Sequence, residues 1–134
     1  MKGSGSKEVS MQKTILLIDD DENLLIILKD IFEAEGYGVV ALSDPVRAEE
    51  YIEKHSPSLL VIDIFMPGRS GFNLIEDFRR HKVYEEIPKI FMTCLDDDIE
   101  RMTARACGVD KYITKPFSPE YVVGCVRNMI GEAV

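Results

Sequence analysis

The stretch "ILLIDDDEN", residues 15–23, runs from four aliphatic residues directly into four carboxylates. A short continuous apolar run is typical of a strand buried on both faces of a parallel sheet. The carboxylates of Asp19 to Glu22 then stand where the strand ends and a helix begins. Acidic residues at a helix N-terminus are stabilising by roughly 0.3–1 kcal/mol each. The stretch alone therefore allows two interpretations, a favourable helix start or part of a charged site.

Length and composition describe an ordinary globular domain, with 134 residues, 46% hydrophobic and 30% charged. No apolar run is long enough to cross a bilayer, so we expect no membrane span. A net charge of −8 disfavours nucleic-acid binding by this chain. Cys94, Cys107 and Cys125 are odd in number and lack metal-type spacing. We interpret them as packing residues in a reducing compartment and expect a cytoplasmic protein.

The first residues are polar and rich in Gly and Ser, without the apolar core of a signal peptide. We expect a flexible leader at residues 1–12 and one folded domain at residues 13–134. Apolar runs predict five buried strands in this domain, at residues 14–18, 37–42, 58–62, 89–93 and 111–114.

Helical patterns lie between these strands. The first is an apolar stripe that begins at Leu24, and Ile99 and Met102 belong to the pattern that marks the fourth helix. Cap residues, prolines and glycines mark the helix ends: Gly36, Asp44-Pro45, Pro57, Gly71, Gly108 and Ser118-Pro119. Regular alternation of strands and helices predicts an α/β fold, a doubly wound parallel sheet with helices on both faces. Such sheets bind ligands beyond the carboxyl ends of their strands.

Reactive side chains stand at four of the strand ends. Asp19 and Asp20 follow the first strand, Asp63 the third, Thr93 ends the fourth and Lys115 follows the fifth. If the first and third strands are neighbours, three carboxylates converge, and their repulsion calls for a cation. Oxygen ligands without nearby His or Cys favour Mg²⁺. A lysine and a hydroxyl beside such a site suit an incoming phosphoryl group.

Each of these residues also has an ordinary structural interpretation. Asp63 suits a helix cap or a turn, Thr93 is a β-branched strand residue, and Lys115 suits an exposed loop. Any one strand end could carry a residue with an ordinary structural role, but it is much less expected that all four do. The combination therefore favours a metal-assisted phosphoryl site.

Four motifs together resemble the receiver domain of two-component response regulators, of the chemotaxis-protein type. They are "LLIDDDEN", "VIDIFMPGRSG", the threonine after "KIFM", and "GVDKYITKPF". The resemblance covers about Lys13 to Gly131. It implies a flavodoxin-like, five-stranded parallel sheet with strand order 2-1-3-4-5. It also implies signalling by phosphorylation, with an output protein or domain as the downstream partner.

The resemblance implies a role for each acidic residue. Asp63 would accept the phosphoryl group from a phosphohistidine on a sensor histidine kinase or a histidine phosphotransfer protein. Asp20 and Asp63 would ligate Mg²⁺ directly, together with the main-chain carbonyl of Phe65. Asp19 would act on the metal largely through bound water.

The resemblance also implies how the signal leaves the site. Thr93 would bond the phosphoryl group, Lys115 would pair with it, and Tyr112 would be the aromatic switch residue. The Lys115-Pro116 peptide would be cis. Phosphorylation would change the surface of the fourth helix, fifth strand and fifth helix. The domain would then be a phospho-acceptor switch that assists its own phosphorylation and dephosphorylation, and not an enzyme.

Some positions depart from the family pattern. Phe65 and Leu95 offer no polar group to orient an attacking water, which predicts slow autodephosphorylation. Lys111 stands where many DNA-binding members have an acidic residue in a dimer face, which weakens the case for that dimer. Arg69 follows Asp63 closely but is expected to be solvated.

Other functions of the same fold fit less well. A metal-dependent phosphohydrolase needs an early D-x-D motif and a cap domain, for which 134 residues leave little room. A flavin-binding protein needs a phosphate-cradling loop after the first strand, where these carboxylates would repel the flavin phosphate. A pseudo-receiver that only binds partners would not need the complete set of phosphorylation residues.

Overall fold

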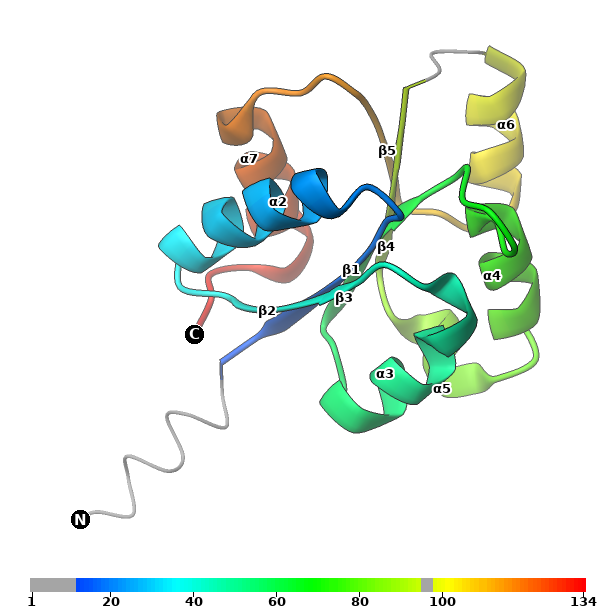
Figure 1. The fold of residues 1–134 in the computed structure, drawn as a ribbon, viewed down its shortest axis with the longest axis horizontal. Coiled ribbons are helices and arrows are strands. Elements are labelled where there is room, and N and C mark those ends of the chain that lie inside the picture. The colour runs from blue at the N-terminus through cyan, green and yellow to red at the C-terminus, as the bar shows by residue number, and fades with distance from the viewer. Residues whose placement is uncertain (1–11, 95–97) are drawn as a thin grey trace.

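The structure, a computed structural model, describes residues 12–94 and 98–134. The leader expected at residues 1–12 therefore lies almost wholly outside the described residues. The chain forms a five-stranded parallel sheet of order β2-β1-β3-β4-β5 with helices on both faces (Figure 1). Both the doubly wound architecture and the strand order are confirmed.

The strands follow the apolar runs of the sequence closely. They are β1 (Thr14–Ile18), β2 (Gly38–Leu42), β3 (Leu59–Asp63), β4 (Lys89–Thr93) and β5 (Lys111–Thr114). β1, β4 and β5 match the prediction residue for residue, β2 begins one residue later than predicted, and β3 begins and ends one residue later. β3 and β4 are buried throughout because helices cover both faces of the sheet.

Side chains cap the amino ends of several of the helical elements. They are α2 (Glu22–Ala34), the 3₁₀ turn η1 (Pro45–Arg47), α3 (Ala48–His55), α4 (Gly71–Phe78), α5 (Lys82–Glu86), α6 (Asp98–Ala106) and α7 (Pro119–Ile130). Ser118 caps α7 through the amide of Tyr121, as expected. Asp44 caps η1, which leads into α3.

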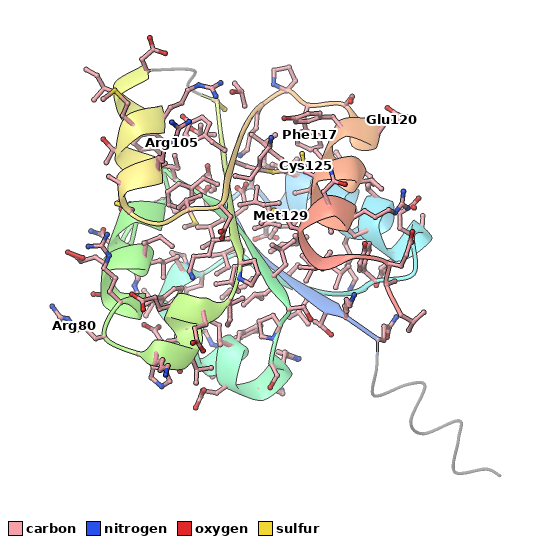
Figure 2. The ribbon with its side chains drawn as sticks, turned by 180° about the vertical axis from the view of Figure 1, so that it is seen from behind. Arg80, Arg105, Phe117, Glu120, Cys125 and Met129 are labelled. Carbon is pink, nitrogen blue, oxygen red and sulfur yellow. The ribbon has the colours of Figure 1, made fainter. Side chains whose placement is uncertain are left out.

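Each face of the sheet has its own apolar core. α2 and α7 cover one face, and α3, α4, α5 and α6 cover the other (Figure 1). Successive residues of β1 alternate between the two, with Ile15 in the first core and Leu16 in the second. From the opposite side, Cys125 and Met129 of α7 are seen to lie on the first core (Figure 2).

α6 differs from the amphipathic helix that its sequence suggests. Ile99 and Met102, two of the residues whose spacing predicts it, are 74% and 71% exposed. Ala104 is its buried residue. The helix thus turns Ala104 toward the sheet and its two large apolar side chains toward solvent.

α5 was not predicted, because its five residues contain one buried side chain, Tyr84, and no periodic stripe. It ends against a buried lysine. Lys89, the first residue of β4, is 4% exposed. Its Nζ donates to the carbonyls of Tyr84 at 2.9 Å, Glu85 at 2.8 Å and Ile87 at 2.6 Å. Burial lowers the pKa of Lys89, and three carbonyls compensate the ammonium for the water that it has lost.

The segment after α7 folds back onto the amino end of β1. The amide of Lys13 donates to the carbonyl of Ala133 at 2.9 Å, and the Tyr37 hydroxyl donates to the carbonyl of Gly131 at 2.6 Å. Ala133 is buried. None of the helices in the described part of the chain is long and apolar enough to cross a membrane.

Candidate functional site

Three carboxylates meet at the carboxyl ends of β1 and β3. These strands are neighbours with Ile18 opposite Ile62, so the next residues, Asp19 and Asp63, lie side by side. Asp19, Asp20 and Asp63 each offer an oxygen within 4.8 Å of the other two. Asp19 and Asp63 are buried, whereas Asp20 is exposed. The cluster therefore has a buried base and one side open to solvent.

The cluster carries more negative charge than its surroundings neutralise. Burial and the charge of Asp19 raise the pKa of Asp63 from 3.8 to about 6. The Nζ of Lys115 lies 2.9 Å from Asp19 Oδ2 and 3.6 Å from Asp63 Oδ1. Burial acts to lower the pKa of Lys115, but the bond to Asp19 and the charges of Asp19 and Asp63 outweigh it and raise that pKa. One ammonium does not balance the charge of three carboxylates, so the cluster would attract a further cation.

The donor set fits a hard divalent ion such as Mg²⁺. All three side chains offer oxygen only, and no His or Cys belongs to the cluster that the described residues form. Asp19 is already held on both oxygens, since Oδ1 accepts from the amide of Asp21 at 2.9 Å and Oδ2 from Lys115. Asp19 thus orients the lysine.

The remaining acids of the opening stretch serve the helix. Asp21 caps α2, and its Oδ1 accepts from the amides of Asn23 at 3.1 Å and Leu24 at 3.2 Å. Glu22 lies in the first turn of α2. Two of the four acidic residues, Asp19 and Asp20, thus belong to the charged cluster, and the other two, Asp21 and Glu22, lie at the start of α2.

Gly71 lets α4 begin directly against the end of β3. Its amide donates to the carbonyl of Ile64 at 2.7 Å. A Cβ on Gly71 would lie 2.8 Å from the carbonyl oxygen of Asp63 and 3.0 Å from the Cα of Ile64. Both atoms belong to the backbone, so a side chain at Gly71 would displace the segment that carries Asp63.

Replacing Gly71 with Ala is expected to lower the free energy of unfolding by about 1–3 kcal/mol, because backbone atoms must shift to admit the methyl group. Denaturant unfolding measures the change. Gly124→Ala in α7 is the matched control, since nothing lies within 4 Å of a Cβ there. That control is expected to stabilise the chain by about 0.5–1 kcal/mol. Equal effects of the two alanines would contradict the close-approach argument.

Arg69 is not solvated, contrary to the expectation from sequence. Its side chain is 16% exposed and forms ion pairs with Glu49 and with Asp77, the latter at 2.9 Å. It also donates to the carbonyl of Pro45 at 3.2 Å. The bond from Arg69 lowers the pKa of Glu49. The loop that follows Asp63 is thereby fastened to η1, α3 and α4 by one guanidinium.

Thr93 and Lys115 are joined through the backbone at the next strand ends. Thr93 is buried, and its carbonyl accepts from the amide of Lys115 at 2.7 Å. It follows Met92, the residue that pairs with Asp63. The Lys115-Pro116 peptide is cis, as the resemblance implied.

The other expected residues surround this edge of the sheet. Phe65 is half exposed in the loop after Asp63. Tyr112 is half-buried on β5, with its hydroxyl 3.4 Å from Glu100 Oε2. Leu95 lies outside the described residues. Cys94 is exposed, so the packing role expected for it is wrong, whereas Cys125 is buried.

Comparisons with known proteins agree with this geometry. Residues 15–127 match the family described as response regulator receiver domain. The alkaline phosphatase synthesis transcriptional regulatory protein PhoP of Bacillus subtilis (strain 168) is 32% identical over 120 residues, which are 90% of this chain and 49% of that protein.

Solved structures of receiver domains are similar to this chain in fold. A CheY-like response regulator receiver domain protein from Methanospirillum hungatei JF-1 has a TM-score of 0.80 at 29% identity, covering 89% of this chain and 94% of that one. The BeF3-activated N-terminal receiver domain of Klebsiella pneumoniae RstA has a TM-score of 0.82 at 26% identity, covering 88% and 98%. The chain spans about half the length of the curated relatives it matches.

Proposed function

The chain belongs to the response regulator receiver domain family, and from this premise we propose that it accepts a phosphoryl group on Asp63. The observation that carries the proposal is the buried Asp63 carboxylate, whose pKa is raised to about 6 and which has two carboxylates and one ammonium within reach. A group in such surroundings is a candidate for function, since fold stability alone gives no reason to gather like charges.

Asp63 must be ionised to act as the nucleophile. Asp20, Asp63 and the main-chain carbonyl of Phe65 would hold Mg²⁺, with Asp19 acting through bound water, and the ion would supply positive charge at the reacting oxygens. An oxygen of Asp63 then attacks phosphorus of a phosphohistidine. The P–N bond breaks, its electron pair stays on the imidazole nitrogen, and an aspartyl phosphate forms.

Lys115 and Thr93 would stabilise the product. The ammonium of Lys115 already faces Asp63 and would pair with a phosphoryl oxygen, to which the Thr93 hydroxyl would donate. Thr93 lies on β4, and the neighbouring strand β5 carries Tyr112 opposite Phe91. A shift of Thr93 toward the phosphoryl group would change the space available to Tyr112, and with it the surface of α6, β5 and α7.

The partners follow from the chemistry. The donor would be a sensor histidine kinase or a histidine phosphotransfer protein. PhoP is named a transcriptional regulatory protein, and this chain spans about half of its length. We therefore place an output domain or a separate output protein downstream. The domain itself acts as a switch that assists its own phosphorylation and dephosphorylation, and not as an enzyme with a separate substrate.

Intact-mass measurement tests the proposal. The chain is incubated with acetyl phosphate, with Mg²⁺ or with a chelator. We expect the mass of one phosphoryl group to be added only when Mg²⁺ is present. Asp63→Asn is expected to abolish the gain, while Asp30→Asn, at an exposed position of α2, is expected to keep it. A gain that survives Asp63→Asn, or its absence from the wild type with Mg²⁺, would overturn the proposal.

The aspartyl phosphate is expected to decay slowly, over minutes or longer. Phe65, two residues beyond Asp63 and half exposed, has no polar group to orient an attacking water. Phe65→Asn is expected to speed the decay on the order of tenfold by positioning that water, and Phe65→Leu to leave it slow. Loss of phosphoprotein over time, followed by mass, gives both rates. A wild-type lifetime of seconds that Phe65→Asn does not change would sink this idea.

A further inference from the structure

The loop of residues 64–70 joins β3 to α4 and carries Phe65, whose main-chain carbonyl is one of the proposed Mg²⁺ ligands. Within the part of the chain that the structure describes, backbone–backbone hydrogen bonds fix this loop only at its ends. The carbonyl of Ile64 accepts from the amide of Gly71 at 2.7 Å, and the carbonyl of Ser70 accepts from an amide of α4 at 3.0 Å. Side chains must therefore fix the backbone around Phe65.

Two side chains anchor this loop, and they do so in different ways. Met66 is 7% exposed and packs in the core beneath α3 and α4. Apolar packing has no preferred direction, so Met66 holds the loop down without orienting its carbonyls. Arg69 can orient the loop, because a guanidinium presents its donors in a rigid plane.

Arg69 bonds the loop to three other elements. Its Nη1 donates to the carbonyl of Pro45 in η1 at 3.2 Å and to Glu49 Oε1 of α3 at 2.7 Å. Its Nη2 donates to Glu49 Oε2 and to Asp77 Oδ2 of α4, the latter at 2.9 Å. The two-point contact with Glu49 is the strongest and most directional form of an arginine–carboxylate pair. Arg69 is 16% exposed, so solvent screens these bonds less than it would at the surface.

The charge of Arg69 is already matched. Glu49 and Asp77 supply two carboxylates to one guanidinium, so Arg69 adds little positive potential to the cluster of Asp19, Asp20 and Asp63. An effect of Arg69 on a bound metal must therefore act through the position of the loop.

We propose that Arg69 is a positioning residue for the metal, and that it sets the preference of the site for Mg²⁺ over Ca²⁺. Mg²⁺ requires near-ideal octahedral geometry with ligands at about 2.0–2.1 Å, whereas Ca²⁺ accepts variable geometry at about 2.3–2.6 Å. A loop held in one conformation meets the stricter requirement, and a loop free to move serves Ca²⁺ nearly as well. This role rests on the proposed function, because the Phe65 carbonyl is a ligand of the Mg²⁺ site proposed there.

NMR titration of the ¹⁵N-labelled full chain with MgCl₂ and with CaCl₂ tests the proposal. Arg69→Gln is expected to weaken Mg²⁺ binding by about tenfold, the lower end of what residues that fix metal ligands contribute, and Ca²⁺ binding by less than about threefold. Arg69→Lys keeps the charge but loses the planar two-point contact, so its effect should fall between the wild type and Arg69→Gln. Glu49→Gln is expected to weaken Mg²⁺ binding more than Asp77→Asn does, because Glu49 accepts through both oxygens.

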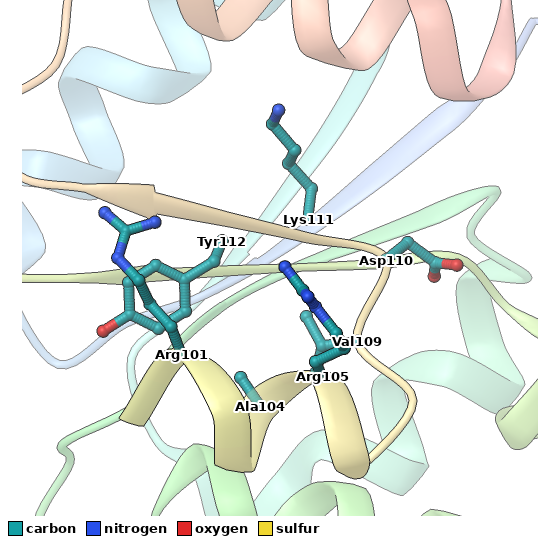
Figure 3. A pocket seen from close by; sticks show the side chains of 7 residues that line it. All are labelled: Arg101, Ala104, Arg105, Val109, Asp110, Lys111 and Tyr112. Atoms are coloured by element: carbon teal, nitrogen blue, oxygen red, sulfur yellow. The ribbon is translucent and has the colours of Figure 1, made fainter. Parts of the chain in front are cut away.

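Two control variants remove the same charge without altering the loop. Arg47→Gln breaks the exposed ion pair of Arg47 with Glu50, which joins η1 to α3. Arg105→Gln acts on α6, where Arg105 lines a groove of about 270 Å³ between α6 and β5 (Figure 3). Both controls are expected to leave the ratio of Mg²⁺ to Ca²⁺ affinity unchanged.

Backbone order parameters from ¹⁵N relaxation give a readout that needs no metal. In a chelator we expect the order parameters of residues 65–69 to fall from about 0.85 in the wild type toward about 0.6 in Arg69→Gln. The strands of the sheet should keep their values. A variant that is destabilised only as a whole would not show this local change.

Three results would overturn the proposal: an unchanged Mg²⁺ affinity in Arg69→Gln, equal losses of Mg²⁺ and Ca²⁺ affinity, or unchanged order parameters in the loop. If Arg69→Gln does not fold, Arg69→Lys and Glu49→Gln carry the same test. Failure of the proposed function has a different signature. An Arg69-dependent preference for Mg²⁺ in a chain that gains no phosphoryl group would uphold the positioning role and sink the phospho-acceptor. Phosphorylation that needs Asp63, with a metal preference that Arg69→Gln leaves unchanged, would do the reverse.

Discussion

Replacing Asp63 with Asn is expected to raise the free energy of unfolding of the magnesium-free protein by about 2–3 kcal/mol above about pH 7. The folded state raises the pKa of Asp63 from 3.8 to about 6, chiefly by burial and by the charge of Asp19. Holding the ionised carboxylate in the fold therefore costs free energy that a neutral amide of similar shape does not. The lost attraction to Lys115, 3.6 Å away, offsets part of the gain.

The stability difference between the wild type and Asp63→Asn is expected to depend on pH. Between about pH 4 and 6 the folded chain binds the Asp63 proton more strongly than the unfolded chain does. The contribution of Asp63 to stability therefore falls as pH rises through that window, and it stays low above it. The advantage of Asp63→Asn should be largest above about pH 7 and should shrink as pH falls toward about 5.

Denaturant unfolding in a chelator, at several pH values, measures the difference between the two proteins. Asp30→Asn, at an exposed position of α2, controls for the general effect of removing one negative charge. Added Mg²⁺ is expected to stabilise the wild type more than Asp63→Asn, because a ligand that binds only the folded state adds to its stability. A destabilised Asp63→Asn protein, or a difference that does not change with pH, would contradict the argument.

Replacing Lys89 with Met is expected to lower the free energy of unfolding by about 2–4 kcal/mol. The variant keeps the length and apolar stem of the side chain but leaves the carbonyls of Tyr84, Glu85 and Ile87 without their shared donor. Lys89 is 4% exposed, so water has little access to replace it. Burial lowers the pKa of Lys89, so the buried charge already costs the wild type some stability. The expected loss of unfolding free energy is therefore smaller than the sum of three lost hydrogen bonds.

Lys82→Met is the matched control, since Lys82 is exposed at the start of α5 and the same substitution there should change stability little. Amide hydrogen exchange gives a second, local measurement. We expect faster exchange in α5 for Lys89→Met, because the last carbonyls of that helix lose their cap. Equal stability of the Lys82 and Lys89 variants would show that the three bonds contribute nothing net.

Much of the sheet was predictable because a parallel strand buried on both faces has to be continuously apolar. "TILLI" and "KIFMT" located β1 and β4 to the residue. The same rule could not show that Lys89, inside the second run, is buried against a helix. α5 has five residues and one buried side chain, too few to produce a period.

Which side of α6 faces the sheet was not predictable from spacing. Ile99 and Met102 have the separation of an inward stripe, yet Ala104 is the residue that packs inward. Helical periodicity identifies an apolar line but does not show whether the protein's own core or another molecule covers it.

The convergence of Asp19 and Asp63 followed from topology, since neighbouring parallel strands end at the same edge of the sheet. The ion pair of Arg69 could not be predicted from topology in this way. Its partner Glu49 lies 20 positions away on another element, so neither the helical nor the strand period relates the two residues. Pairs of this kind depend on how the loop and α3 pack together, and a single sequence does not contain that information.

The fold-back of the final segment onto Lys13 has a practical consequence for experiments on single molecules. Lys13 and Ala133 meet at the amino end of β1, whereas Asp19 follows its carboxyl end. A five-residue strand separates these two edges by roughly 17 Å. A dye or surface linkage attached after Val134 would therefore report on the chain from the edge opposite the carboxylates, and it would leave the open side of the carboxylate cluster unobstructed.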